Sequence, residues 1–147
     1  MKILIVGDVV GKSGRLAVAE HLPGLSEQMS LDFVIVNGEN AAHGFGITDK
    51  ICAGFYENGA DVITTGNHVW DQREIMEYFP TEPRLLRPIN FPEGAPGAGS
   101  VVLETAKGKI GVINAQGRVF MNPPLEDPLL AVERAAMAMR EEGVRAI

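Results

Sequence analysis

The hydrophobic pattern of the chain alternates between short apolar runs and longer amphipathic segments. Three runs are rich in β-branched residues and lack polar alternation, which predicts parallel strands covered on both faces. They are residues 2–8 ("KILIVGD"), 32–40 ("DFVIVNGEN") and 61–67 ("DVITTGN").

Helices are predicted after each of these strands. Val18, Leu22, Leu25 and Met29 lie at helical spacing, and Pro23 with Gly24 predicts a break or kink after Leu22. Thr48 or Asp49 is a suitable cap for a helix that runs to about residue 58, with Gly59 ending it in a left-handed conformation. A short helix over 71–79 is closed by Pro80. The βαβαβα order predicts an α/β fold with a mostly parallel sheet and right-handed crossovers.

The second half of the chain differs in pattern. Residues 84–99 carry three prolines and three glycines, which predicts a surface loop around a short strand. Residues 100–105 and 109–114 flank a tight turn and predict an antiparallel hairpin. Asp127 and Pro128 begin a helix that ends near Gly143 and is predicted to bury Leu129, Val132, Ala136 and Met139. The strand-like residues 144–147 then resemble the start of another α/β unit, so we expect one domain over 1–147 that is incomplete at its C-terminus.

Polar side chains follow each predicted parallel strand at its carboxyl end. Asp8 ends the first strand, Glu39 and Asn40 end the second, and Asn67 and His68 end the third. A single Asp after a strand is more often a turn residue. Because ligands in open α/β sheets bind outside the carboxyl ends of the strands, five such residues are expected to converge on one crevice.

The donor types at these strand ends are those of a metal site. Two carboxylates, two amide oxygens and an imidazole suit a divalent ion such as Mn, Fe, Zn or Mg. A glycine precedes each group (Gly7, Gly38 and Gly66), which removes side-chain bulk where an ion must be approached. A Glu can bridge two ions, and in two-metal hydrolases such a pair, about 3.5–4 Å apart, activates a hydroxide and clamps phosphoryl oxygens.

Composition excludes several classes of protein. A chain of 147 residues corresponds to about one domain. The net charge of −6 and the pI near 5.0 argue against an extended nucleic-acid or anionic-membrane surface. The single Cys52 excludes an internal disulfide framework and a Cys-rich metal site. No signal peptide is evident and no apolar run reaches the roughly 18 residues of a membrane span, so a cytoplasmic protein is expected.

Five motifs, in this order and spacing, resemble those of the calcineurin-like metallophosphoesterase superfamily. They are "GDVVGKSGR", "NGENAAHGFGIT", "TTGNHVWDQ", "LLRPINFP" and "INAQGRVFM". Within that superfamily they resemble the small bacterial branch of 2′,3′-cyclic-nucleotide 2′-phosphodiesterases, and the match runs over the whole chain. The resemblance implies a layered α/β/α metallophosphoesterase fold, two divalent metal ions (Fe or Mn, or else Zn or Mg), and a small phosphodiester or nucleotide substrate.

The resemblance also implies a role for each strand-end residue. Asp8 binds one metal, Glu39 bridges both, and Asn40 and Asn67 bind the second. His68 is implied to be the proton donor to the leaving oxygen rather than a ligand. The family completes its site with histidines from later segments, and this chain has only His21, His43 and His68. It therefore resembles roughly the N-terminal half of the family, and the apolar edge it is expected to expose favours self-association into a homo-oligomer.

Alternative functions stay open at this point. One is a non-catalytic metal- or phosphate-binding remnant of the fold. Another is a P-loop-like nucleotide binder, although G-x-x-x-x-G-K-[ST] needs four residues between its glycines and Gly7 to Gly11 leaves three. Several residues are weaker candidates for phosphate contacts, because each is as readily a cap or a solvated loop residue: Lys12, Ser13, Arg15, His43 and Arg118. Cys52 is expected in the core and His21 on the surface.

Overall fold

The computed structural model describes residues 1–121 and 125–147. Its main sheet has four parallel strands. The strands follow their sequence order across the sheet, and each pairs with the next in parallel. They are β1 (Ile3–Val6), β2 (Phe33–Asn37), β3 (Val62–Thr64) and β4 (Leu85–Leu86). This arrangement confirms the predicted α/β fold and its parallel sheet.

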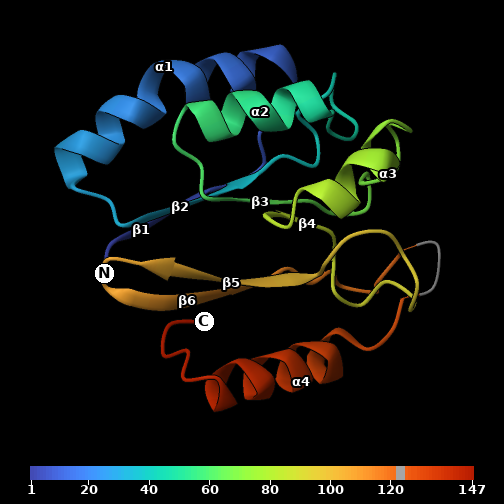
Figure 1. Cartoon of the computed structure of the whole chain (residues 1–147). Helices are drawn as coiled ribbons and strands as arrows, with labels where there is room; N and C mark the ends of the chain where they lie inside the picture. The colour runs from blue at the N-terminus through green and yellow to red at the C-terminus, as the bar shows by residue number, and fades with distance from the viewer. Residues whose placement is uncertain (122–124) are drawn as a thin grey trace.

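Four layers follow one another through the molecule (Figure 1). Helices α1 (Gly11–Met29) and α2 (Asp49–Glu57) cover one face of the parallel sheet, and the antiparallel hairpin of β5 (Ser100–Thr105) and β6 (Gly108–Ile113) lies on the other. Helix α4 (Pro128–Glu141) covers the far side of the hairpin. The hairpin, predicted from its turn, thus forms a second sheet layer facing the first.

Two apolar clusters hold these layers together. The larger lies mainly between the helices and the parallel sheet. The smaller lies between the two sheets and consists of Phe33, Val62, Leu86, Ile110 and Val112. Because both faces of β2 and β3 are buried, these strands read in the sequence as continuous apolar runs.

Helix α1 does not break at Pro23, so the predicted break after Leu22 is wrong. The helix continues from Gly11 to Met29 with Pro23 inside it. Proline removes the bond that its N–H would donate to the carbonyl of Ala19. Both residues are exposed, so water can satisfy that carbonyl. The buried residues of the helix are Val18 and Leu22, while Leu25 and Met29 are partly exposed at 39% and 48%.

The end signals predicted for α2 are confirmed. The Thr48 hydroxyl accepts a hydrogen bond from the Ile51 N–H at 3.3 Å, and Gly59 adopts a φ of 101° just after the helix.

The third helix is shorter than predicted. Only Ile75–Tyr78 is α-helical (α3), and Phe79–Thr81 continues as a 3-10 turn (η1) that contains Pro80. The residues before α3 form turns rather than a helix, and these turns present the 68–72 segment to the carboxyl edge of the sheet.

Helix α4 begins as predicted, since the Asp127 carboxylate accepts from the N–H groups of Leu129 and Leu130. The prediction that Leu129 is buried is wrong, because its side chain is 79% exposed. Leu129 lies two positions before the buried Ala131, which places it on the opposite side of a helix with about 3.6 residues per turn. Met139 is buried as predicted.

Both sheets have open edges. Ala146 forms a parallel bridge to Ile110 with its carbonyl accepting from Gly111 N–H at 2.8 Å, so residues 144–147 do start a strand-like pairing. At the edge of the parallel sheet, Ile3 and Ile5 of β1 are 42% and 71% exposed. The second layer therefore does not cover β1.

Candidate metal centre and active site

The loops that follow β1, β2 and β3 are tied together at the carboxyl edge of the sheet. The N–H of Val9 donates to the Asn37 carbonyl at 3.0 Å, and the N–H of Gly38 donates to that of Thr64 at 3.0 Å. Gly11 N–H donates to the Asn40 carbonyl at 2.9 Å. These bonds bring the three strand ends to one place, as the positions of the polar residues predicted.

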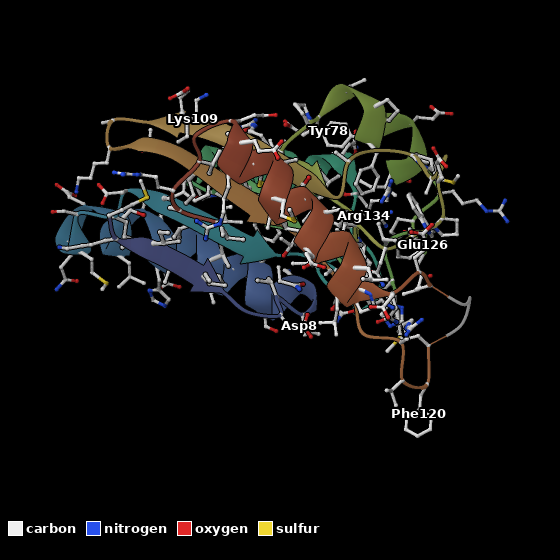
Figure 2. All side chains as sticks on the ribbon, turned by 90° about the horizontal axis from the view of Figure 1, so that it is seen from below. Asp8, Tyr78, Lys109, Phe120, Glu126 and Arg134 are labelled. Carbon is white, nitrogen blue, oxygen red and sulfur yellow. The ribbon has the colours of Figure 1, made fainter. Side chains whose placement is uncertain are left out.

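Asp8 and Asn40 are in direct contact. The amide nitrogen of Asn40 donates to both carboxylate oxygens of Asp8 at 2.9 Å. The amide oxygen of Asn40 is buried and has no hydrogen-bond partner among the described residues. Asp8 itself is exposed at the margin of the molecule (Figure 2). The pair therefore combines an accessible carboxylate with an unsatisfied amide oxygen.

Glu39 lies against the backbone of Gly66. A Cβ on Gly66 would lie 2.5 Å from Cδ and 2.9 Å from Oε1 of Glu39, and closer still to Oε2. Burial raises the pKa of Glu39 above its ordinary value, and the Asp8 carboxylate raises it further. His68 and the N–H groups of Asn67 and His68 act in the opposite direction. Glu39 is thus close to the other predicted site residues.

Close contacts with neighbouring side chains require the two glycines that precede Glu39 and Asn67. A Cβ on Gly38 would meet Ile47 at 2.6 Å, and Gly66 is required by the Glu39 carboxylate. A Cβ on Gly7 would meet nothing within 4 Å, so close approach does not explain that glycine.

The donors present fit a divalent cation. Oε2 of Glu39 is buried without a hydrogen-bond partner in the part of the chain that the structure describes, as is Oδ1 of Asn40. A cation would satisfy both atoms, whose burial otherwise costs free energy. Across residues 1–121 and 125–147, no three His, Cys, Asp or Glu side chains gather closely enough to form a metal-binding group by themselves. The donor set is therefore mixed carboxylate and amide, with Asn67 exposed beside it.

His68 is oriented by an acidic partner. Its Nδ1 lies 2.7 Å from Oδ2 of Asp71, and its ring makes an edge contact with Phe45, with 4.9 Å between ring centroids. A carboxylate at Nδ1 holds the imidazole in one orientation and leaves Nε2 for other contacts. The structure therefore gives His68 a fixed ring with Nε2 as the nitrogen that does not face Asp71.

The weaker candidates for phosphate contacts differ in their surroundings. Arg15 donates to the Ala41 carbonyl and so supports the loop after Asn40. Arg118 forms an ion pair with Asp127 at 3.2 Å. Lys12, Ser13 and His43 are exposed, and so is His21. Cys52 is fully buried and burial raises its pKa, which confirms its place in the core.

Three features of the site were missed by the sequence reasoning. Asp71 follows His68 by three residues, and this spacing is the signal that could have identified it. Asn37 accepts the Glu39 N–H at 3.1 Å. Asn114 at the end of β6 donates to the carbonyls of Thr65 and Leu86, which ties the second sheet to the site edge of the first. Neither Asn carries a distinguishing sequence signal.

None of the helices in the described part of the chain combines the length and apolar character that crossing a membrane requires.

Comparisons with known proteins identify the family of this chain. The model of the YmdB-like protein family matches residues 4–147. A Bacillus subtilis (strain 168) protein named 2′,3′-cyclic-nucleotide 2′-phosphodiesterase is 49% identical over 133 residues, which are 90% of this chain and 50% of the relative. A Mycoplasma pneumoniae protein named putative phosphatase/phosphodiesterase is 36% identical over 121 residues, 80% of this chain and 43% of its own length.

Two solved structures share the fold. A hypothetical protein from Thermus thermophilus has a TM-score of 0.85 with 38% identity, over 92% of this chain and 52% of that one. A structure described as a novel phosphatase from Mycoplasma pneumoniae has a TM-score of 0.86 with 32% identity, over 94% and 51%. The chain spans about half the length of the relatives it matches. With the family model covering nearly all of its residues, the chain belongs to the YmdB-like family.

Proposed function

We propose that this chain carries the metal-binding and proton-donating residues of a phosphodiester hydrolase that acts on nucleoside 2′,3′-cyclic phosphates. The observation that carries the proposal is the pair of buried, unpartnered oxygens of Glu39 and Asn40 beside the Asp8 carboxylate. The name of the Bacillus subtilis relative supports the reaction and the substrate class.

Each site residue has a role in this proposal. Asp8 would hold one ion, Glu39 would be shared by two, and Asn40 and Asn67 would hold the second, with Fe or Mn as the expected metal and Zn or Mg as alternatives. When bound, the two ions supply Lewis acidity that activates water and neutralises charge on the phosphoryl oxygens. Glu39 presents its carboxylate across the Gly66 backbone, where no side chain intervenes.

His68 is the proton donor to the leaving oxygen in this proposal. With Nδ1 facing Asp71 at 2.7 Å, its Nε2 is the atom that donates to the leaving ribose oxygen. Asp71 fixes the orientation of the imidazole, so it acts as a positioning residue.

A non-catalytic metal- or phosphate-binding module is the second candidate. The observation that favours it is the small number of donors in the described residues, which include no group of three His, Cys, Asp or Glu. Asp8 and Glu39 alone would hold the first ion weakly, so we expect little turnover from residues 1–147 by themselves.

The test measures hydrolysis of a nucleoside 2′,3′-cyclic phosphate and of bis(p-nitrophenyl) phosphate with excess Mn²⁺. The chain is assayed alone and mixed with a separately made C-terminal half of the Bacillus subtilis relative. The proposal expects activity in the mixture. It also expects that His68→Ala lowers the rate far more on the cyclic nucleotide, because p-nitrophenolate leaves with less need of a proton.

Equal losses on the two substrates, or loss of bound metal in His68→Ala, would make His68 a ligand or structural residue. Metal binding without turnover in any mixture would favour the non-catalytic module.

A further inference from the structure

Phe45 is an exposed aromatic residue next to the imidazole of His68. Its side chain is 57% exposed, although the residues around it in the same loop, Ala41, Ala42 and Ile47, are almost fully buried. The rings of Phe45 and His68 meet edge to face at 4.9 Å between centroids. A large apolar side chain in this position contacts the imidazole and still leaves more than half of its own surface open to solvent.

The loop that presents Phe45 is held in an uncommon backbone conformation. His43, Gly44 and Gly46 all have positive φ, at 57°, 96° and 77°. Glycine adopts such values freely, and histidine is one of the other residues found there more often than most. The loop therefore makes a tight turn before and after Phe45.

Hydrogen bonds fix the loop on both sides of Phe45. The Phe45 N–H donates to the Ala42 carbonyl at 3.0 Å, and the side chain of Gln72 donates to the Phe45 carbonyl at 2.8 Å. The Ala42 N–H donates to the Gly46 carbonyl at 2.9 Å. A Cβ on Gly46 would lie 3.0 Å from Gln72, so the loop packs closely on the segment that carries His68. The ring is therefore presented by a preorganised loop.

The position of Phe45 relative to the reaction follows from the role of His68. In a nucleoside 2′,3′-cyclic phosphate the leaving oxygen belongs to the ribose, and the base is attached to the carbon next to the one that bears the 2′ oxygen. A donor that protonates the leaving oxygen lies on the ribose side of the phosphorus. The ring beside that donor then faces the nucleoside and not the attacking water.

We propose that Phe45 is a stacking platform for the nucleobase and determines the preference for nucleotides over other phosphate esters. This inference rests on the proposed function and adds a residue for the part of the substrate that the metal site does not touch. Stacking on an aromatic ring is tolerant of base identity, because every base has a π-face. The structure thus assigns selectivity for nucleosides as a class.

The experiment compares binding of adenosine 3′-monophosphate and inorganic phosphate to the 147-residue chain in the presence of Mn²⁺, by calorimetry or amide NMR. Stacking adds roughly 10-fold to the affinity for the nucleotide. Phe45→Leu should abolish this difference and leave the phosphate affinity unchanged, and Phe45→Trp should retain it. Phe120→Leu is the matched control, since Phe120 is fully exposed and extends away from the rest of the chain (Figure 2).

Three results count against the inference and are distinguishable. Equal affinity for the two ligands, or a nucleotide preference that survives in Phe45→Leu, overturns the role of Phe45 alone. Binding of neither ligand, by the chain and by its mixture with the C-terminal half of the relative, overturns the proposed phosphodiester site, and the inference falls with it.

Discussion

Gly66→Ala is a direct steric test of the candidate metal centre. The added methyl group would lie 2.5 Å from Cδ of Glu39, whereas favourable carbon–carbon contacts are at about 3.5–4.0 Å. The carboxylate must therefore move by about 1 Å, because the obstacle on the other side is backbone. Metal–oxygen distances tolerate only about 0.2 Å. The substitution should displace the one residue proposed to bridge both ions.

The expected magnitudes follow from this overlap. Forcing a methyl group into a packed site costs about 1–3 kcal/mol. For a chain of this size, about 2 kcal/mol corresponds to a fall in Tm of roughly 4–8 °C. Changes to groups that merely support a metal ligand weaken binding about 10- to 100-fold, so displacement of the ligand itself should reach about 100-fold or more.

The assay combines thermal unfolding with calorimetric titration of Mn²⁺. Gly7→Ala is the matched control, since it adds the same methyl group before another ligand but meets nothing within 4 Å. We expect its stability to stay within about 0.5 kcal/mol of the original chain, with unchanged metal affinity. If Gly66→Ala kept the original Tm and bound Mn²⁺ within threefold of the unmodified chain, the steric reasoning about Glu39 would be refuted.

Three further predictions concern other parts of the molecule. In the mixture with the C-terminal half of the relative, Glu39→Gln should abolish tight binding of both ions, since a neutral amide bridges poorly; two ions retained per chain in metal analysis would contradict the bridging role. Asn114→Ala should lower the free energy of unfolding by about 1–3 kcal/mol in urea denaturation, because its amide donates to two buried carbonyls, and an unchanged midpoint would contradict it. Ile5→Lys should reduce concentration-dependent self-association in sedimentation velocity, because a charge protects an open strand edge, whereas Leu129→Lys on α4 should have no such effect.

Local signals in the sequence determined most of the secondary structure. The apolar runs predicted β1, β2 and β3, and turn chemistry predicted the β5–β6 hairpin. Thr48 and Asp127 marked helix starts because a capping side chain needs only the backbone of the next turn, which is local information. The strand-end positions also predicted that Asp8, Glu39 and Asn40 would meet, because parallel strands bring their carboxyl ends to one edge of a sheet.

Predictions that depended on the surroundings of a residue were the ones that failed. Pro23 lies within a continuous helix because it is on the solvent side, and Leu129 is exposed because α4 buries the stripe that contains Ala131 and Met139. Both outcomes depend on which face of a helix packs inward. In each helix the apolar residues are compatible with more than one buried face.

The finer features of the site depended on tertiary structure in the same way. The carboxylate of Glu39 lies against the backbone of Gly66, and Asp71 contacts His68 within the turns that precede α3. The loop that carries Phe45 is held beside the His68 segment by a hydrogen bond between residues 27 positions apart. Sequence composition and spacing determined which chemical groups this chain brings to the edge of the sheet. Their contacts, burial and unsatisfied oxygens were decided only by the packing of loops that are distant in sequence.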